Sequence, residues 1–235
     1  GRCLNNCTKG GKYALHSALQ NVLAKALNGQ NLKAVIVEAH PYDTESNRTD
    51  ISISSAENPG EILYYVDTTV TNTQQKRIPK LKKLTDADNI VCCRDLLLNE
   101  TVVNNHIFSA TAKKLRKFKG CHDSACENGR PPSSIVVPFA VDTLGNFCSV
   151  AVIFLKKLAK IKFEKIPGST EFRDLTASTW VNTTCRDIQT AIIKTCAYNN
   201  RSALKLAFGE EYDKLYPGSI YSPPSYNENF SSSEG

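Results

Sequence analysis

Residues 48–71, RTDISISSAENPGEILYYVDTTVT, contain two short strand-forming stretches with one aspartate in each. Residues 50–54 (DISIS) alternate polar and apolar side chains, as a half-buried strand does, whereas residues 62–70 (ILYYVDTTV) are rich in aromatic and β-branched side chains. The intervening residues 58–60 (Asn-Pro-Gly) are a strong turn signal, so the whole segment predicts a β-hairpin. Such a hairpin would bring the two aspartates together.

Of these two acids, Asp67 needs the stronger explanation. A carboxylate in the middle of an apolar strand is costly to bury unless a cation, a metal ion or a catalytic use compensates its charge. Paired with Asp50, it would suit a hard divalent ion, because Mg²⁺ takes one or two protein carboxylates and keeps several waters. Glu38, at the end of the preceding apolar stretch, would complete an acidic pocket, and Lys114 would point in from a later basic helix.

Structural interpretations of the same residues stay open. Asp50 can simply begin a strand and pair with Arg48, and Asp67 can be a hydrogen-bonded structural acid. Glu38 lies just before His40 and Pro41 at a strand end, where a solvated side chain is equally reasonable. Lys114 belongs to a lysine-rich stretch that also fits an exposed helix surface.

Outside the hairpin, the hydrophobic pattern predicts alternating helices and strands. Apolar pairs repeat every four residues over residues 12–28, which predicts an amphipathic helix, and residues 32–38 read as a buried strand. A basic helix is expected over residues 106–119, a core strand over 134–143 and a packing helix over 147–158. The order helix, three strands, helix, strand, helix predicts an α/β fold built on one mixed sheet.

The length of 235 residues favours one main domain with additions. We expect a short N-terminal remnant (1–11), a core domain (12–160), a helical extension (161–215) and a disordered Ser-, Pro- and Asn-rich tail (216–235). In the extension, the pattern over residues 180–206 favours one or two helices. The absence of methionine, even at position 1, leads us to expect a piece of a longer polypeptide.

The chain has a net charge of +6 and dense basic clusters at residues 76–83 and 113–119, which suit a polyanionic partner but are also typical of solvated surfaces. We expect Arg48, Lys113 and Lys117 to contact the phosphates of such a partner. No stretch approaches the roughly 20 apolar residues of a membrane helix, so we expect no membrane association.

Nine cysteines with irregular spacing make a poor disulfide framework, so reduced thiols and an intracellular protein are expected. Six Asn-x-Ser/Thr sequons keep a secreted, disulfide-bonded glycoprotein open as an alternative. Cys3, Cys7 and His16 are candidate zinc ligands, but a fourth ligand is not evident.

Five segments together resemble the PD-(D/E)XK nuclease family. They are Glu38, RTD ending at Asp50, YYVDTTV around Asp67, AKKLRKF around Lys114 and VVPFAVDTLG ending at Gly145. More narrowly, their order resembles the restriction-endonuclease-like domain C-terminal to the reverse transcriptase of some non-LTR retrotransposons. The resemblance covers roughly residues 12–160 and depends on order and spacing rather than on any one motif.

This resemblance implies a restriction-endonuclease-like core, dependence on Mg²⁺ or Mn²⁺, and cleavage of DNA in the nucleus. Asp50 and Asp67 would be the metal ligands, Lys114 the catalytic lysine and Glu38 a supporting acid. An upstream reverse-transcriptase domain would be a partner in the full-length protein. Thr69 occupies the position of the usual lysine, so catalysis would depend on Lys114. The alternative is an inactive nucleic-acid-binding or interaction module of the same fold.

Overall fold

The structure of the protein is a computed structural model. It describes residues 9–29, 31–40, 48–71, 107, 110–114, 116–118 and 135–215. The expected N-terminal remnant up to residue 8, the basic cluster at 76–83 and the expected disordered tail from 216 lie outside these residues.

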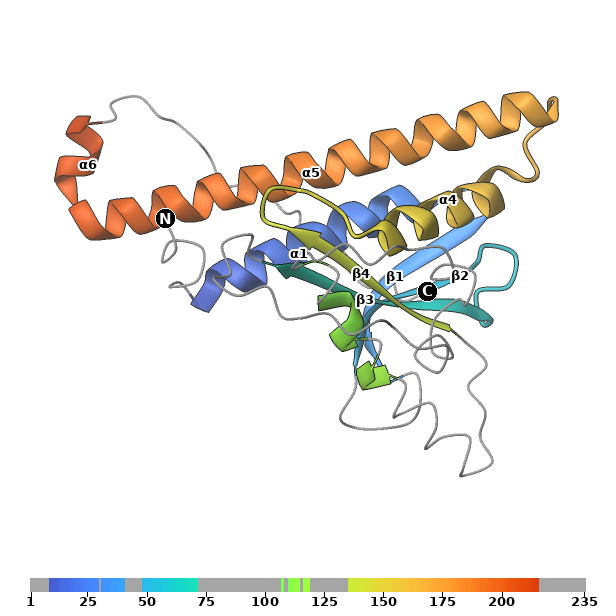
Figure 1. Cartoon of the computed structure of the whole chain (residues 1–235), viewed down its shortest axis with the longest axis horizontal. Helices are drawn as coiled ribbons and strands as arrows, with labels where there is room; N and C mark the ends of the chain where they lie inside the picture. Colours follow the sequence, from blue (N-terminus) through green and yellow to red (C-terminus); the bar gives the residue numbers. More distant parts are fainter. Residues whose placement is uncertain are drawn as a thin grey trace, which may run out of the picture.

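The elements appear in the order expected from the sequence (Figure 1). They are α1 (Lys9–Leu27), β1 (Leu32–Ala39), β2 (Thr49–Ser55), β3 (Ile62–Thr71), β4 (Ile135–Asp142), α4 (Ser149–Phe163), α5 (Thr170–Phe208) and α6 (Glu210–Leu215). The described residues between 107 and 118 are helical, as predicted for the basic segment before β4.

The four strands form one mixed sheet in the order β1-β2-β3-β4. β1 pairs antiparallel with β2, β2 pairs antiparallel with β3, and β3 pairs parallel with β4. The predicted turn between β2 and β3 is present, and the backbone N–H of Glu61 donates to the carbonyl of Asn58 at 3.1 Å. The prediction of an α/β fold with one mixed sheet is therefore confirmed.

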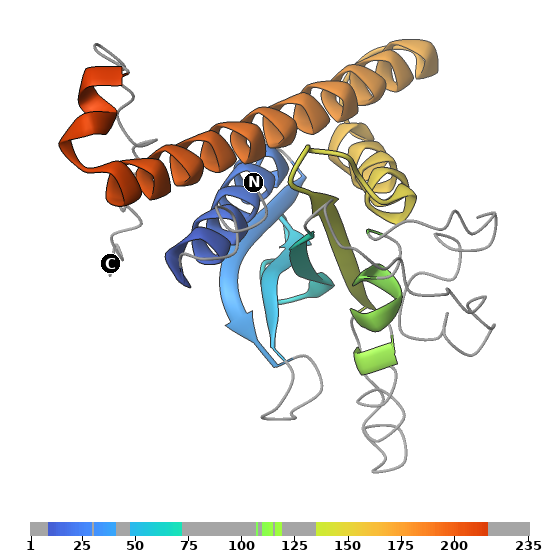
Figure 2. The ribbon, with the colours of Figure 1, turned by 60° about the vertical axis from the view of Figure 1, so that its left-hand side comes forward.

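Helices cover one face of the sheet in two layers (Figure 2). α1 packs on β1 and β3, α4 packs on β4, and α5 crosses over both helices. Strand residues that alternate along β3 and β4 point into this layer, as the edge-to-face contact of Tyr64 with Phe154 at 5.2 Å illustrates. Fully buried Leu19, Phe139 and Ile188 from α1, β4 and α5 belong to the same core.

Lys162 fixes the end of α1 against α4. Its Nζ donates to the carbonyls of Ala26, Leu27 and Asn28 at 2.9, 3.0 and 2.8 Å, which satisfies carbonyls that have no partner within the helix. Burial lowers the pKa of Lys162. This clamp holds α1, and therefore the side chains that α1 presents to the sheet, in a fixed position.

α5 is a single helix of 39 residues and begins ten residues before the helical pattern recognised over residues 180–206. Its N-cap is Ser169, whose hydroxyl accepts from the backbone N–H of Phe172 at 3.2 Å. The first turns carry the exposed side chains of Phe172 and Leu175, so no one-sided apolar pattern indicates a helix there. The predicted boundary at residue 160 lies within α4, and the extension shares the core of the main domain.

Within the described part of the chain, none of the helices combines the length and apolar character needed to span a membrane.

Candidate active site

The β2-β3 hairpin places Asp50 and Asp67 on neighbouring strands. Its antiparallel register pairs Ile51 with Val66, and Asp50 and Asp67 are the residues next to this last pair. The hairpin predicted from the sequence therefore brings the backbones of the two acids close, but the Asp50 carboxylate contacts Thr68 and His16, whereas the Asp67 carboxylate contacts Lys114. Their charges interact, since the negative charge of Asp50 is among the causes that raise the pKa of Asp67.

A β-bulge in β1 lies directly across from Asp50. Ile36 pairs with Ile51 and Ala39 pairs with Thr49, so two residues of β1, Val37 and Glu38, face the single residue Asp50. Bulges of this kind bend a strand and change the direction of nearby side chains, and they are frequent next to active sites. The apolar run that predicted a buried strand over residues 32–38 gave no sign of this irregularity.

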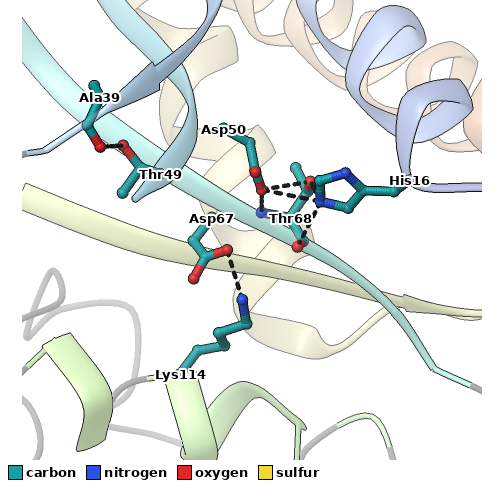
Figure 3. Close-up of polar contacts among 7 residues, drawn as sticks. All are labelled: His16, Ala39, Thr49, Asp50, Asp67, Thr68 and Lys114. Carbon is teal, nitrogen blue, oxygen red and sulfur yellow. Dashed lines mark hydrogen bonds and ion pairs between the residues drawn. The ribbon is translucent and has the colours of Figure 1, made fainter. Parts of the chain in front are cut away.

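Asp50 is held by three donors that share one of its oxygens (Figure 3). The backbone N–H of Thr68 donates to Oδ2 of Asp50 at 2.5 Å, and the Thr68 hydroxyl donates to the same oxygen at 2.8 Å. Nε2 of His16, which projects from α1, lies 3.2 Å from this oxygen. Asp50 is thus at the beginning of a strand, as the structural interpretation has it, but its partners are Thr68 and His16 rather than Arg48.

The surrounding acceptors determine which nitrogen of His16 carries a proton. Nε2 lies 2.9 Å from the Thr68 hydroxyl oxygen and 3.3 Å from the Thr68 carbonyl oxygen, in addition to its contact with Asp50. Because the carboxylate and the carbonyl only accept, and the Thr68 hydroxyl already donates to Asp50, we assign the proton to Nε2.

These contacts favour charge on both His16 and Asp50. The hydrogen bond to Asp50 raises the pKa of His16 above its usual value of 6.5, although burial opposes this rise. For Asp50, burial by itself would raise the pKa. The hydrogen bonds from His16 and Thr68 outweigh this effect, and the pKa of Asp50 falls below its usual value of 3.8. Asp50 is therefore ionised at neutral pH.

Asp67 is the more deeply buried acid, and its side chain is only 3% exposed. Its Oδ1 accepts from Nζ of Lys114 at 2.8 Å, while its buried Oδ2 has no hydrogen-bond partner among the described residues. Burial raises the pKa of Asp67 above its usual value of 3.8, and the nearby Lys114 offsets only part of this effect. The predicted approach of Lys114 to this acid is confirmed.

The two halves of the site come from different faces of the sheet. Asp67 and Thr68 are consecutive in β3, so their side chains point to opposite faces. Thr68 meets His16 on the face covered by α1, and Asp67 meets Lys114 from the helical residues 110–114 (Figure 3). Asp50, at the start of β2, lies between these halves and is turned toward Thr68.

Glu38 does not join the contacts of either aspartate among the described residues. It forms an ion pair with Arg48, and the two side chains are 72% and 59% exposed. The supporting role predicted for Glu38, and the phosphate contact predicted for Arg48, stay predictions.

Lys113 and Lys117 are exposed on the helical residues that carry Lys114. Lys117 lies over the ring of the buried Phe118, with its Nζ 5.0 Å from the ring centroid. The charge of Lys117 also lowers the pKa of Asp67, so it is part of the same electrostatic environment. These positions leave both lysines accessible to a polyanionic partner.

The donors present fit a magnesium-type ion better than zinc. Asp67 offers a buried carboxylate oxygen that has no partner among the described residues, and Asp50 is an ionised acid on the neighbouring strand. Hard carboxylate oxygens suit Mg²⁺ or Mn²⁺, which complete their coordination with waters or phosphate oxygens. Within the described ranges, no group of three or more His, Cys, Asp or Glu side chains is arranged to hold a metal ion. Cys3 and Cys7, considered with His16 for zinc, lie outside those ranges.

Comparisons with protein-family models, with curated proteins and with solved structures found no significant match for this chain. The interpretation of the site therefore depends on its own geometry and chemistry.

Sequence reasoning missed the contribution of His16 and Thr68 to the site. Apart from Tyr13, His16 is the only ionisable side chain between Lys12 and Lys25, within a helix that is otherwise mostly apolar. That isolation is a signal that could have pointed to a buried polar contact. No comparable signal distinguishes Thr68 from the other threonines of β3.

The raised pKa of Asp67 predicts a specific pH dependence of stability in metal-free solution. As the pH rises from 3.8 through the higher folded pKa, the unfolded chain releases this proton first, so the parent protein loses stability. The Asp67→Asn variant has no carboxyl group at this position, so it lacks this pH-dependent loss of stability. Urea unfolding with EDTA from about pH 3 to about pH 7 should show the variant gaining relative to the parent as the pH rises. A difference that stays constant, or that moves the other way, would contradict the assignment.

Proposed function

We propose that this chain is a metal-dependent DNA endonuclease domain of the PD-(D/E)XK type, from a retroelement-like protein. The observation that carries the proposal is the state of Asp67. This acid is buried, one oxygen is paired with Lys114, the other has no partner among the described residues, and the ionised Asp50 lies on the next strand. A purely structural buried acid is expected to have both oxygens satisfied.

The architecture supports the same proposal. A mixed α/β sheet flanked by helices is the core expected of a restriction-endonuclease-like domain, and the three central site residues come from adjacent strands and the following helix. Such rigid elements hold charged groups more precisely than loops do.

In this proposal Asp50 and Asp67 hold the divalent cation. When bound, Mg²⁺ or Mn²⁺ would lower the pKa of a water and offset negative charge on the phosphate oxygens. The buried position of Asp67 keeps its charge poorly compensated until a cation arrives. Asp50, with its pKa lowered, supplies a second negative charge without first losing a proton.

Lys114 is suited to orienting the attacking water and stabilising charge on the phosphate. Its side chain is 29% exposed, so the ammonium group pairs with Asp67 and still reaches solvent. As the cationic member of an ion pair it acts through its charge and its N–H donors, rather than by accepting a proton.

The DNA backbone would lie along the helical residues that carry the exposed Lys113 and Lys117. We expect the double variant Lys113→Ala/Lys117→Ala to bind DNA more weakly and to reduce the slope of log K against log salt by about 2, since each phosphate contact adds about 0.9. Fluorescence anisotropy over a range of salt concentrations measures this slope.

The matched control is Lys25→Ala/Lys33→Ala, which removes two exposed lysines from α1 and β1. Its salt slope should remain that of the parent protein. Equal effects of the two double variants would show that binding follows net charge alone, and would remove the assignment of phosphate contacts to the 113–117 stretch.

The direct test of the function is incubation of supercoiled plasmid with the purified chain and Mg²⁺. Conversion to nicked or linear DNA that stops on addition of EDTA is the expected result. Salt-sensitive binding without cleavage in Mg²⁺ or Mn²⁺ would instead favour an inactive nucleic-acid-binding module of the same fold. The proposal also implies a nuclear protein with an upstream reverse-transcriptase domain.

A further inference from the structure

Three donor groups of His16 and Thr68 surround one oxygen of Asp50. The Thr68 N–H, the Thr68 hydroxyl and Nε2 of His16 lie 2.5, 2.8 and 3.2 Å from Oδ2. Three donors on a single carboxylate oxygen fix the rotation of the group, because turning it would break all three contacts at once. The second oxygen, Oδ1, is then held in a fixed direction.

Contacts among His16, Thr68 and Asp50 connect α1 to the sheet. The Thr68 hydroxyl accepts from His16 and donates to Asp50, so the three side chains form a closed network. Thr68 is 2% exposed, whereas the side chain of His16 is 34% exposed. The network therefore extends from the buried Thr68 to the partly exposed His16 at the edge of the core.

The β-bulge opposite Asp50 explains why such a network is needed. With two residues of β1 facing Asp50, the regular pairing of β2 is interrupted beside the acid. The regular pairing of β2 with β3 ends at Ile51, and the backbone N–H of Thr68 donates to the side chain of Asp50. Without other contacts, a carboxylate at an interrupted strand end would have several orientations available.

We propose that His16 and Thr68 are positioning residues that orient the Asp50 carboxylate for the divalent cation, an inference that rests on the proposed function. They act through Asp50 and do not bind the cation themselves. Groups that orient metal ligands in this way typically contribute about 10- to 100-fold to metal affinity. His16 thereby links α1, which the Lys162 clamp holds in place, to the metal site on the sheet.

The test measures Mg²⁺ affinity without relying on activity. Ligand binding raises the melting temperature of the folded chain, so a titration of MgCl₂ followed by thermal unfolding gives an apparent Kd. His16→Leu removes the donor, and His16→Gln keeps an N–H near the position of Nε2. We expect His16→Leu to weaken the apparent Kd for Mg²⁺ by about 10-fold or more, and His16→Gln to restore most of it.

A second pair of variants protects the test against misfolding. Thr68→Val keeps the shape of this buried side chain and removes the hydroxyl, whereas Thr68→Ser keeps the hydroxyl. Thr68→Val should weaken Mg²⁺ binding, and Thr68→Ser should not. Gln20→Leu, one helical turn beyond His16 on α1, is the control for a polar-to-apolar change and should leave the Mg²⁺ affinity unchanged.

The outcomes separate this inference from the proposed function. If the parent protein binds Mg²⁺ and Asp67→Asn abolishes binding, but His16→Leu and Thr68→Val bind normally, the positioning role is wrong and the nuclease proposal stands. If the parent protein shows no Mg²⁺-dependent stabilisation and no cleavage, both are overturned. Loss of binding in His16→Leu that His16→Gln does not repair would indicate a general structural effect and also overturn the positioning role.

Discussion

Asp67→Asn is expected to reduce the rate of Mg²⁺-dependent plasmid nicking by about 10²- to 10³-fold or more, the loss found when one charge-stabilising group is removed from a catalytic site. The amide keeps the shape of the side chain but replaces the anionic oxygens that would hold the cation. Single-turnover nicking rates at saturating protein measure the effect.

The variant Asp187→Asn is the matched control, since it makes the same chemical change at an exposed position on α5. Its nicking rate should stay within about twofold of the parent protein, as is usual for exposed sites away from chemistry. Circular dichroism and the urea midpoint establish that Asp67→Asn is folded. Cleavage by Asp67→Asn at the parent rate would remove this acid from the catalytic site.

Lys114→Met is expected to lower the nicking rate by about 10²-fold or more while DNA binding changes much less. Methionine keeps most of the length and volume of lysine but lacks the ammonium group that lies 2.8 Å from Oδ1 of Asp67. The loss should therefore appear in the rate of cleavage by the bound enzyme, measured in single-turnover experiments, rather than in the Kd for DNA.

Lys113→Met tests whether the loss of nicking rate in Lys114→Met depends on the position of the lysine or only on its charge. Lys113 precedes Lys114 on the same helical residues but is exposed, so it is expected to contribute to binding only. Its single-turnover rate should remain close to that of the parent protein at saturating DNA. Equal losses in Lys113→Met and Lys114→Met would indicate that both lysines act through general electrostatics, and that Lys114 has no special role.

Regular features of the sequence were enough to predict the fold class. The four-residue repeat of apolar pairs predicted α1, and the Asn-Pro-Gly turn at residues 58–60 predicted the β2-β3 hairpin. Both signals are local, because helix periodicity and turn chemistry are written in adjacent residues. The length of α5 was not predictable, because the apolar side chains of its first turns, Phe172 and Leu175, are exposed and form no one-sided apolar pattern.

The part of the site that could be predicted from the sequence is the charged residue that is unexpected in an apolar strand. Asp67 was conspicuous because its strand is otherwise apolar, and Lys114 was the basic residue suggested by the order of segments; the structure brings the two together. His16 and Thr68 were not recognised because their roles arise from contacts between distant parts of the chain. Glu38 was grouped with the acids by its place at the end of a strand, but the bulge in β1 accompanies an exposed ion pair with Arg48 instead.

The most direct test of the shared cation is a crystal of the protein soaked in Mn²⁺ and measured at the manganese absorption edge. The account predicts one anomalous peak within about 2.1 to 2.3 Å of a carboxylate oxygen from both Asp50 and Asp67, with Lys114 beside it. Two results would contradict the shared cation on which the nuclease proposal depends. One is the absence of a peak at these acids at a Mn²⁺ concentration that stabilises the protein in solution, and the other is a peak coordinated by only one of the two acids.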